Sequence, residues 1–184
     1  MRRTALVAGA ALLVGFAVVG TTKALSATET RRVALDDPTI VAIFDAANTA
    51  DIETGALGAK KGTTKDIRDY GRMLSDVHTA VRQQGRDLAK KLGVTPTPPA
   101  GDQSAKDHAA AMQKLESLKG AAFDRAFLEH EQAYHAAVLK AVGGTLLPAI
   151  QNAELKKFVT DLAPAFEAHR LQAENLLKKV PAAN

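Results

Sequence analysis

Three histidines and three carboxylates of this 184-residue sequence are predicted to lie on or next to the apolar faces of helices, where ionisable groups are uncommon. At about 100° of rotation per residue, His78 falls on the face defined by Leu74 and Val81, and His169 falls on the face that contains Phe166. The whole set of candidates is His78, His135, His169, Asp51, Glu53 and Glu131. Each of four long helical segments therefore directs at least one ionisable group toward the core.

These side-chain types match the ligands that first-row transition metals prefer, which are neutral imidazole and carboxylate. The set predicts a site in the core for one transition-metal ion, such as zinc, iron or manganese, built from facing helices. A hydrogen-bonded polar layer, in which Asp51 or Glu131 pairs with a histidine and fixes the helix register, explains the same residues without a metal. Both interpretations stay open at this point.

A third interpretation, a di-iron oxidase or a peroxide-handling enzyme, requires Glu-x-x-His on each of two helices. The residues three positions before His78 and His169 are Ser75 and Phe166, and a glutamine precedes His135 at the same spacing. The two carboxylate-histidine pairs of such a centre cannot be assembled in this way. We therefore expect no catalytic residues and a protein that is not an enzyme.

The depth of each candidate along its helix follows from a rise of about 1.5 Å per residue. The residues predicted at similar depth are Asp51, Glu53, His78 and Glu131. His169 is predicted about one turn nearer the first hairpin, and His135 about two turns in the opposite direction. This spacing predicts a polar cluster in the middle of the helices but does not select its metal ligands.

The elements that must position these residues are helices, because the chain is rich in Ala, Leu, Lys, Gln, Asp and Glu and lacks alternating β-branched runs. Proline, glycine and capping residues set the expected ends. The predicted helices span about 38–61, 64–92, 104–118, 121–142 and 152–179. Pro164 is expected to kink the last of them. The pattern predicts an all-α, ferritin-like four-helix bundle whose long crossover carries the short helix.

The first 27 residues have the layout of a secretory signal peptide, with a basic start, an apolar run and small residues near Ala27 where cleavage is expected. Residues 28–37 are expected to form a disordered lead-in, and 38–180 the bundle domain. The predicted location is periplasmic or secreted, without stable membrane insertion after cleavage. An N-terminal membrane anchor is the alternative, because the apolar run is about long enough to span a bilayer.

Charge and composition argue against nucleic-acid binding. Without the basic residues of the leader, 21 basic and 20 acidic side chains remain, and aromatic residues make up only 4% of the chain. The sequence therefore lacks the excess of basic residues that would neutralise phosphates and the aromatic residues that would stack on bases. Cysteine is absent, so export brings no disulfide framework.

Several motifs, in their order and spacing, resemble a family of bacterial envelope proteins catalogued as domain of unknown function 4142. They are A-N-T-A-D-I-E-T-G-A-L-G-A, Met-Leu-x-x-x-His-Thr at 73–79, L-A-K-K-L-G-V-T-P, G-A-A-F-D-R-A-F-L, His135 and L-A-P-A-F-E-A-H. The resemblance runs from about residue 39 to 179. It implies a ferritin-like fold in the bacterial envelope, without an established activity.

The chain departs from the family's pattern at two positions. Val77 stands where an acid usually precedes the histidine of the second helix, with Asp76 one position earlier, and Asp51 stands where the family commonly has glutamate. The sequence as a whole predicts a non-enzymatic envelope protein with a binding or structural role. A protein partner or a homo-oligomer is compatible with it, and the sequence identifies neither.

Overall fold

The computed structural model describes residues 35–181, and among them the chain is entirely helical with no strand. The elements are α1 (Asp37–Lys61), α2 (Lys65–Lys91), α3 (Ser104–Ser117), α4 (Gly120–Ala141), the π-helical turn η1 (Val142–Leu146), the single turn α5 (Leu147–Ala149) and α6 (Ala153–Leu177). The predicted all-α class is confirmed. The predicted signal peptide (1–27) and most of the lead-in (28–37) lie outside the described residues.

Short polar caps define the first helices, as the sequence predicts. The Asp36 side chain accepts a hydrogen bond from the Thr39 amide (2.9 Å), and Pro38 occupies the first turn, where a missing N–H costs nothing. α1 ends at Lys61, before the capping residue Gly62, and the Thr64 hydroxyl accepts from the amide of Ile67 (3.3 Å) at the start of α2. These caps limit the connection between α1 and α2 to three residues.

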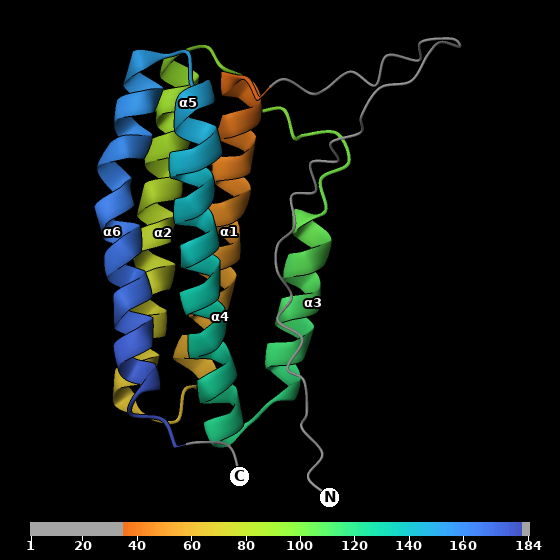
Figure 1. Cartoon of the computed structure of the whole chain (residues 1–184). Helices are drawn as coiled ribbons and strands as arrows, with labels where there is room; N and C mark the ends of the chain where they lie inside the picture. The colour runs from red at the N-terminus through yellow and green to blue at the C-terminus, as the bar shows by residue number, and fades with distance from the viewer. Residues whose placement is uncertain (1–34, 182–184) are drawn as a thin grey trace, which may run out of the picture. The chain divides into compact units, whose positions relative to one another are not determined.

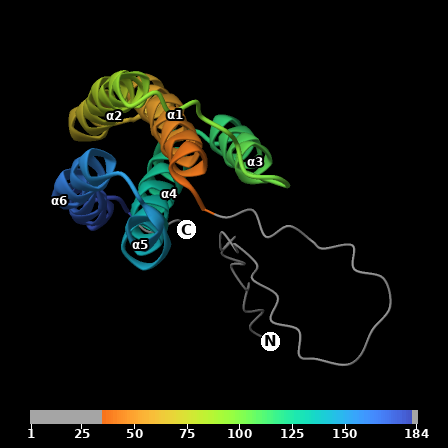
Figure 2. The same ribbon diagram turned by 90° about the horizontal axis from the view of Figure 1, so that it is seen from above.

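The four long helices α1, α2, α4 and α6 run side by side (Figures 1 and 2). α1 and α2 form one hairpin, α4 and α6 lie against each other, and α3 lies outside them beside α1 and α4. α3 is attached through the buried Leu115 and through Lys61, whose ammonium group donates to the carbonyl oxygens of Leu115 (3.0 Å) and Glu116 (2.6 Å). α3 therefore contributes no residue to the interior between the four long helices at mid-length.

The core consists of two apolar clusters separated by a polar layer. One cluster contains Leu74, Phe127 and Leu128, and the other contains Ile40 and Val159. The polar side chains of the layer come from the middle of each long helix, between the segments that supply the two clusters. The buried members of this layer are Asn48, Asp51, Thr54, His78, Glu131, His135 and His169. The apolar clusters thus hold the polar layer away from water at both ends.

Asp124, which is also buried, belongs to the end of the structure and not to this layer. Its carboxylate accepts hydrogen bonds from the amide (3.0 Å) and the hydroxyl of Thr63 in the turn between α1 and α2. This contact ties the first turn of α4 to the hairpin.

The α1–α2 hairpin is closely packed because glycines face each other across it. A Cβ atom on Gly71 would lie 2.4 Å from the backbone nitrogen of Ala59 and 2.6 Å from the carbonyl oxygen of Gly55. Backbone atoms cannot move aside as the end of a flexible side chain can. We therefore expect Gly71→Ala to lower the free energy of unfolding by about 2 kcal/mol, within the range for overpacked cores, measured by urea denaturation.

Gly144→Ala is the matched control, because a Cβ there would meet nothing within 4 Å. Its expected change is within about 0.5 kcal/mol, as for surface substitutions. Equal destabilisation by both variants would mean that close approach of the helices is not the cause.

The structure differs from the sequence prediction after α4. The sequence predicts that the helix ends near residue 142, before Gly143 and Gly144, but the chain continues through η1 and α5 before α6 begins. Pro164 lies inside α6, which continues through it as one helix. Across residues 35–181, no helix has the length and apolar character needed to cross a membrane.

Candidate metal centre

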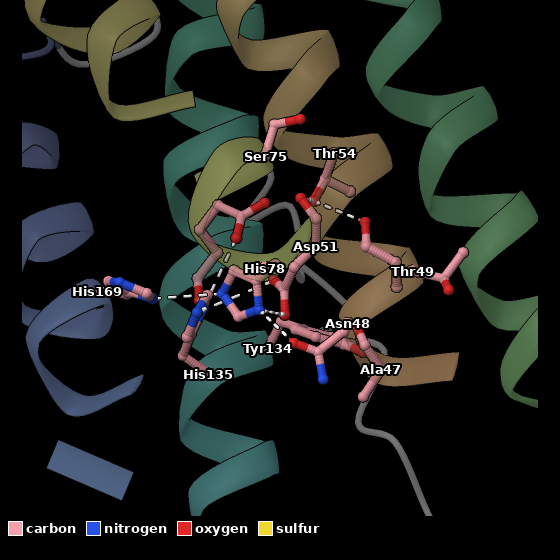
Figure 3. Close-up of polar contacts among 12 residues, drawn as sticks. Ala47, Asn48, Thr49, Asp51, Thr54, Ser75, His78, Tyr134, His135 and His169 are labelled. Atoms are coloured by element: carbon pink, nitrogen blue, oxygen red, sulfur yellow. Dashed lines mark hydrogen bonds and ion pairs between the residues drawn. The ribbon is translucent and has the colours of Figure 1, made fainter. Parts of the chain in front are cut away.

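His78 is buried at the centre of the polar layer, although the neighbouring turns of α2 bury Leu74 and Val81. Its Nδ1 atom lies 2.9 Å from the side-chain oxygen of Asn48 and 3.5 Å from Oδ2 of Asp51 (Figure 3). Both partners come from α1, which packs directly against α2. The apolar face of α2 therefore carries a histidine because α1 supplies polar partners at that level.

The hydrogen bonds of Asn48 fix which nitrogen of His78 carries the hydrogen. The Asn48 amide nitrogen donates to the carbonyl oxygen of Phe44 (2.8 Å), so its oxygen faces His78. An amide oxygen only accepts, and Nδ1 of His78 must therefore donate. The lone pair of His78 is thereby placed on Nε2, which lies 3.3 Å from Nδ1 of His169.

His135 is fixed in the same way by its own helix. Its Nδ1 atom donates to the carbonyl oxygen of Glu131, one turn earlier on α4 (3.0 Å), which leaves the lone pair on Nε2. That Nε2 atom is buried, has no hydrogen-bond partner among the described residues, and lies 3.9 Å from Oδ1 of Asp51. An imidazole held at one nitrogen by a carbonyl, with the other nitrogen free, is the arrangement of histidines that bind metals.

Two carboxylates, Asp51 and Glu131, complete the layer. Within residues 35–181, neither side-chain oxygen of Glu131 has a hydrogen-bond partner, and Oδ1 of Asp51 has none. Burial raises the pKa of Glu131 to about 8. Burial, together with the negative charge of Glu131, raises the pKa of Asp51 well above its usual value. A buried carboxylate without a donor or a cation is costly, so these acids hold protons in the metal-free protein at neutral pH, and a bound cation would replace those protons.

The three histidines are kept neutral by their surroundings. Burial lowers the pKa of His78 to about 3 and that of His135 to about 4, and it also lowers the pKa of His169. The neighbouring imidazoles act in the same direction on His78. Neutral imidazole is the form that binds a metal, so these residues need not lose a proton at neutral pH.

Aromatic side chains close the site and fix the helices around it. The ring of Phe166 stacks on His78, with 5.6 Å between centroids and 13° between planes. The hydroxyl of Tyr70 donates to the carbonyl oxygen of His169 (3.1 Å), and that of Tyr134 donates to the carbonyl oxygen of Ala47 (3.3 Å). These contacts connect α2 to α6 and α4 to α1 at the level of the polar layer.

Two overlapping groups of residues have the geometry of metal ligands. In each group, one ligand atom per residue lies within 4.8 Å of the others. The first group is His78, His135 and His169, and the second is Asp51, Glu131 and His135. All five residues are buried. The arrangement is suited to holding a divalent transition-metal ion away from solvent.

The structure brings together five of the six residues that the sequence singles out, and Glu53 lies elsewhere. The Glu53 side chain is 52% exposed and faces α3, where it accepts a hydrogen bond from Nε2 of His108 (2.7 Å). His135 and His169, predicted about three turns apart in depth, lie at one level, with 5.4 Å between ring centroids.

Asn48 is the residue that sequence reasoning missed. It is 2% exposed and lies three residues before Asp51, on the same face of α1. An asparagine within an apolar arc, one turn from a candidate ligand, was the available signal.

Comparison with known families adds one result. The family described as "Domain of unknown function (DUF4142)" matches residues 22–176. The chain belongs to this family. No curated protein and no solved structure matches the chain. Family membership carries no activity with it, so the argument for function rests on the polar layer.

Asn48 offers a test of ligand orientation that leaves every candidate ligand in place. Asn48→Leu removes the acceptor that holds the hydrogen on Nδ1 of His78. Changes of this kind around metal-binding histidines typically cost about 10–100-fold in affinity, and we expect a loss in this range, measured by metal competition with a chromophoric chelator. Thr49→Val is the control, because the Thr49 hydroxyl donates to Asp45 on the neighbouring turn and not to a histidine. An unchanged affinity in Asn48→Leu would contradict the assigned role.

Proposed function

We propose that this chain is an exported ferritin-like helical bundle that binds one transition-metal ion in its core. The observation that carries the proposal is the proximity of the imidazoles of His78 and His135, each with its lone pair on Nε2, beside buried carboxylates that lack hydrogen-bond donors. Each imidazole is oriented by an oxygen acceptor on its other nitrogen. His169 supplies a third imidazole at the same level.

A hydrogen-bonded polar layer without a metal fits these contacts less well. Such a layer would use its hydrogen bonds to satisfy the buried groups. Here four buried atoms of Asp51, Glu131 and His135 have no partner among residues 35–181. A divalent cation would satisfy the carboxylate oxygens and the imidazole nitrogen together.

The proposed role is binding and not oxygen chemistry. A di-iron centre uses two carboxylate-histidine pairs of the Glu-x-x-His type. In this chain the acid of α4 precedes its histidine by four residues, and α2 and α6 provide histidines without such an acid. A single ion with mainly imidazole and carboxylate ligands is therefore the better match.

The ferritin-like arrangement is supported by the order of the elements. The hairpins α1–α2 and α4–α6 are joined by residues 92–119, which include α3, so one long crossover connects two helix pairs. Export is supported by the basic and apolar layout of residues 1–27. A location in the bacterial envelope follows from export and from the setting that the family resemblance implies.

Elemental mass spectrometry of the full chain, expressed with its own leader and purified without chelator or affinity tag, tests the proposal. The protein would then be loaded separately with Zn²⁺, Mn²⁺, Fe²⁺, Cu²⁺ and Ni²⁺ and dialysed. We expect close to one ion per chain for at least one metal. Bound metal should also stabilise the fold by about 4 kcal/mol at a free concentration a thousand times the Kd. Absence of binding for all five ions would contradict the proposed function.

A further inference from the structure

The two groups of candidate ligands share one residue. We call His78, His135 and His169 the nitrogen set, and Asp51, Glu131 and His135 the oxygen set. Asp51 lies beside both, because its Oδ2 is 3.5 Å from Nδ1 of His78 and its Oδ1 is 3.9 Å from Nε2 of His135. The two sets therefore describe neighbouring positions for an ion within one buried layer.

The shared histidine has only one lone pair to offer. Nδ1 of His135 donates to the carbonyl oxygen of Glu131, so Nε2 alone can bind an ion. A metal at the nitrogen set and a metal at the oxygen set would both require this atom. The two positions are therefore alternatives.

The sets differ in chemistry. Three neutral imidazoles suit zinc, copper and nickel, whereas two carboxylates with one imidazole suit manganese, which prefers oxygen ligands. The acids of the oxygen set can also supply negative charge, because a divalent ion that binds there displaces their protons. At most sites Cu²⁺ and Zn²⁺ bind more tightly than Mn²⁺. At a separate, oxygen-rich position the affinity of Mn²⁺ falls less far below that of Cu²⁺ and Zn²⁺.

The contact between His78 and His169 distinguishes the two positions further. Because the lone pair of His78 is on Nε2, Nδ1 of His169 donates the hydrogen in their 3.3 Å contact. An ion at the oxygen set leaves this hydrogen bond intact. An ion at the nitrogen set replaces it, and when His169 binds through Nδ1 its hydrogen must move to Nε2 of the same ring.

We propose that the polar layer is one metal site with two mutually exclusive positions, which take nitrogen-preferring and oxygen-preferring ions respectively. Zn²⁺ and Cu²⁺ bind at the nitrogen set, Mn²⁺ binds at the oxygen set, and His135 belongs to both. This inference rests on the proposed metal-binding function and adds the choice of ligands for each ion.

The test compares two variants of the full chain, each altered in one set only. His169→Gln changes the nitrogen set, and Glu131→Gln changes the oxygen set with an isosteric side chain. We expect His169→Gln to lower Zn²⁺ affinity at least about 100-fold, since a change in an outer partner alone costs about 10–100-fold, and to leave Mn²⁺ affinity within about threefold. Glu131→Gln should show the opposite pattern. Calorimetric titration measures both affinities, and circular dichroism melting confirms that each variant folds.

Two further readouts start from the wild-type chain, and the first also uses His169→Gln. Electron paramagnetic resonance of bound Cu²⁺ should show coupling to three nitrogens, reduced to two in His169→Gln. Protein saturated with Mn²⁺ should release it as Zn²⁺ is added, with the total staying at one ion per chain.

The outcomes separate the two proposals. If no ion binds the wild-type chain, the metal-binding function itself fails. If ions bind but both variants weaken Zn²⁺ and Mn²⁺ equally, or if Zn²⁺ and Mn²⁺ are held together at two ions per chain, the metal-binding function stands and the two-position site is wrong.

Discussion

Replacement of His78 by alanine is expected to lower Zn²⁺ affinity at least about 100-fold, because removal of a ligand should cost no less than the 10–100-fold loss seen for outer partners. His78 is 1% exposed, and its Nε2 carries a lone pair directed toward His169. Alanine removes this nitrogen and leaves a cavity beside Phe166. The measurement is metal content after dialysis, followed by competition with a chelator of known affinity.

His108→Ala is the matched control for this prediction. His108 is a histidine of the same chain that bonds to Glu53 on the outer side of α1, away from the polar layer. Its loss should leave the metal content unchanged. If His78→Ala kept a full complement of Zn²⁺, or if both variants lost it, His78 would not be a ligand and the nitrogen set would have to be abandoned.

The effect of His78→Ala on the stability of the metal-free protein must be separated from its effect on metal affinity. A buried histidine cut back to alanine leaves unfilled space, and large-to-small changes in cores cost about 2–5 kcal/mol. The wild-type chain and the variant should therefore be compared by urea denaturation with chelator present. His78→Gln, which retains more volume without the imidazole, should lose metal as His78→Ala does while unfolding at a higher urea concentration.

The helices and the faces they bury could be predicted from sequence because the signals are local. Asp36, Pro38 and Thr64 act on their own first turns, and the predicted boundaries of α1 and α2 fall within one residue of those observed. The inward directions of His78 and His169 follow from helical periodicity alone. Both side chains are buried as that periodicity predicts.

Depth and partners could not be predicted, because they depend on how one helix is placed against another. The error for His135 and His169 arises where η1 and α5 add helical turns after Ala141, which the glycine pair at 143–144 did not indicate. Glu53 lies at the edge of the α1 face, and only the packing of α3 directs it toward His108. The role of Asn48 depends on the position of His78 across the hairpin, 30 residues away in sequence.

The second large effect is expected in the metal-free protein, where Glu131→Gln should raise stability at alkaline pH. Burial raises the pKa of Glu131 from an ordinary value of 4.5 to about 8 in the folded state. Between these values the folded chain holds a proton that the unfolded chain has lost, so stability falls as pH rises through this window. For one titrating group, the free energy of unfolding changes by at most about 1.4 kcal/mol per pH unit.

Glutamine keeps the shape of the protonated acid and cannot ionise. By pH 8.5 the variant should therefore exceed the metal-free wild type in free energy of unfolding by roughly 2–4 kcal/mol. The two proteins should converge toward pH 5. Urea denaturation at a series of pH values, with chelator present, measures this difference.

The histidines of the polar layer set the lower limit of the pH range over which the two proteins can be compared. Burial lowers the pKa of His78 to about 3 and that of His135 to about 4, so these groups cost stability as pH falls below their ordinary value of 6.5. That loss is common to the wild-type chain and the variant and cancels in their difference. Glu129→Gln, two residues away on the exposed side of α4, is the control for loss of a carboxylate and should show no comparable gain in free energy of unfolding at pH 8.5. A difference that stays constant from pH 5 to 8.5 would mean that Glu131 does not change its protonation state in the folded core over this range, which would contradict the raised pKa.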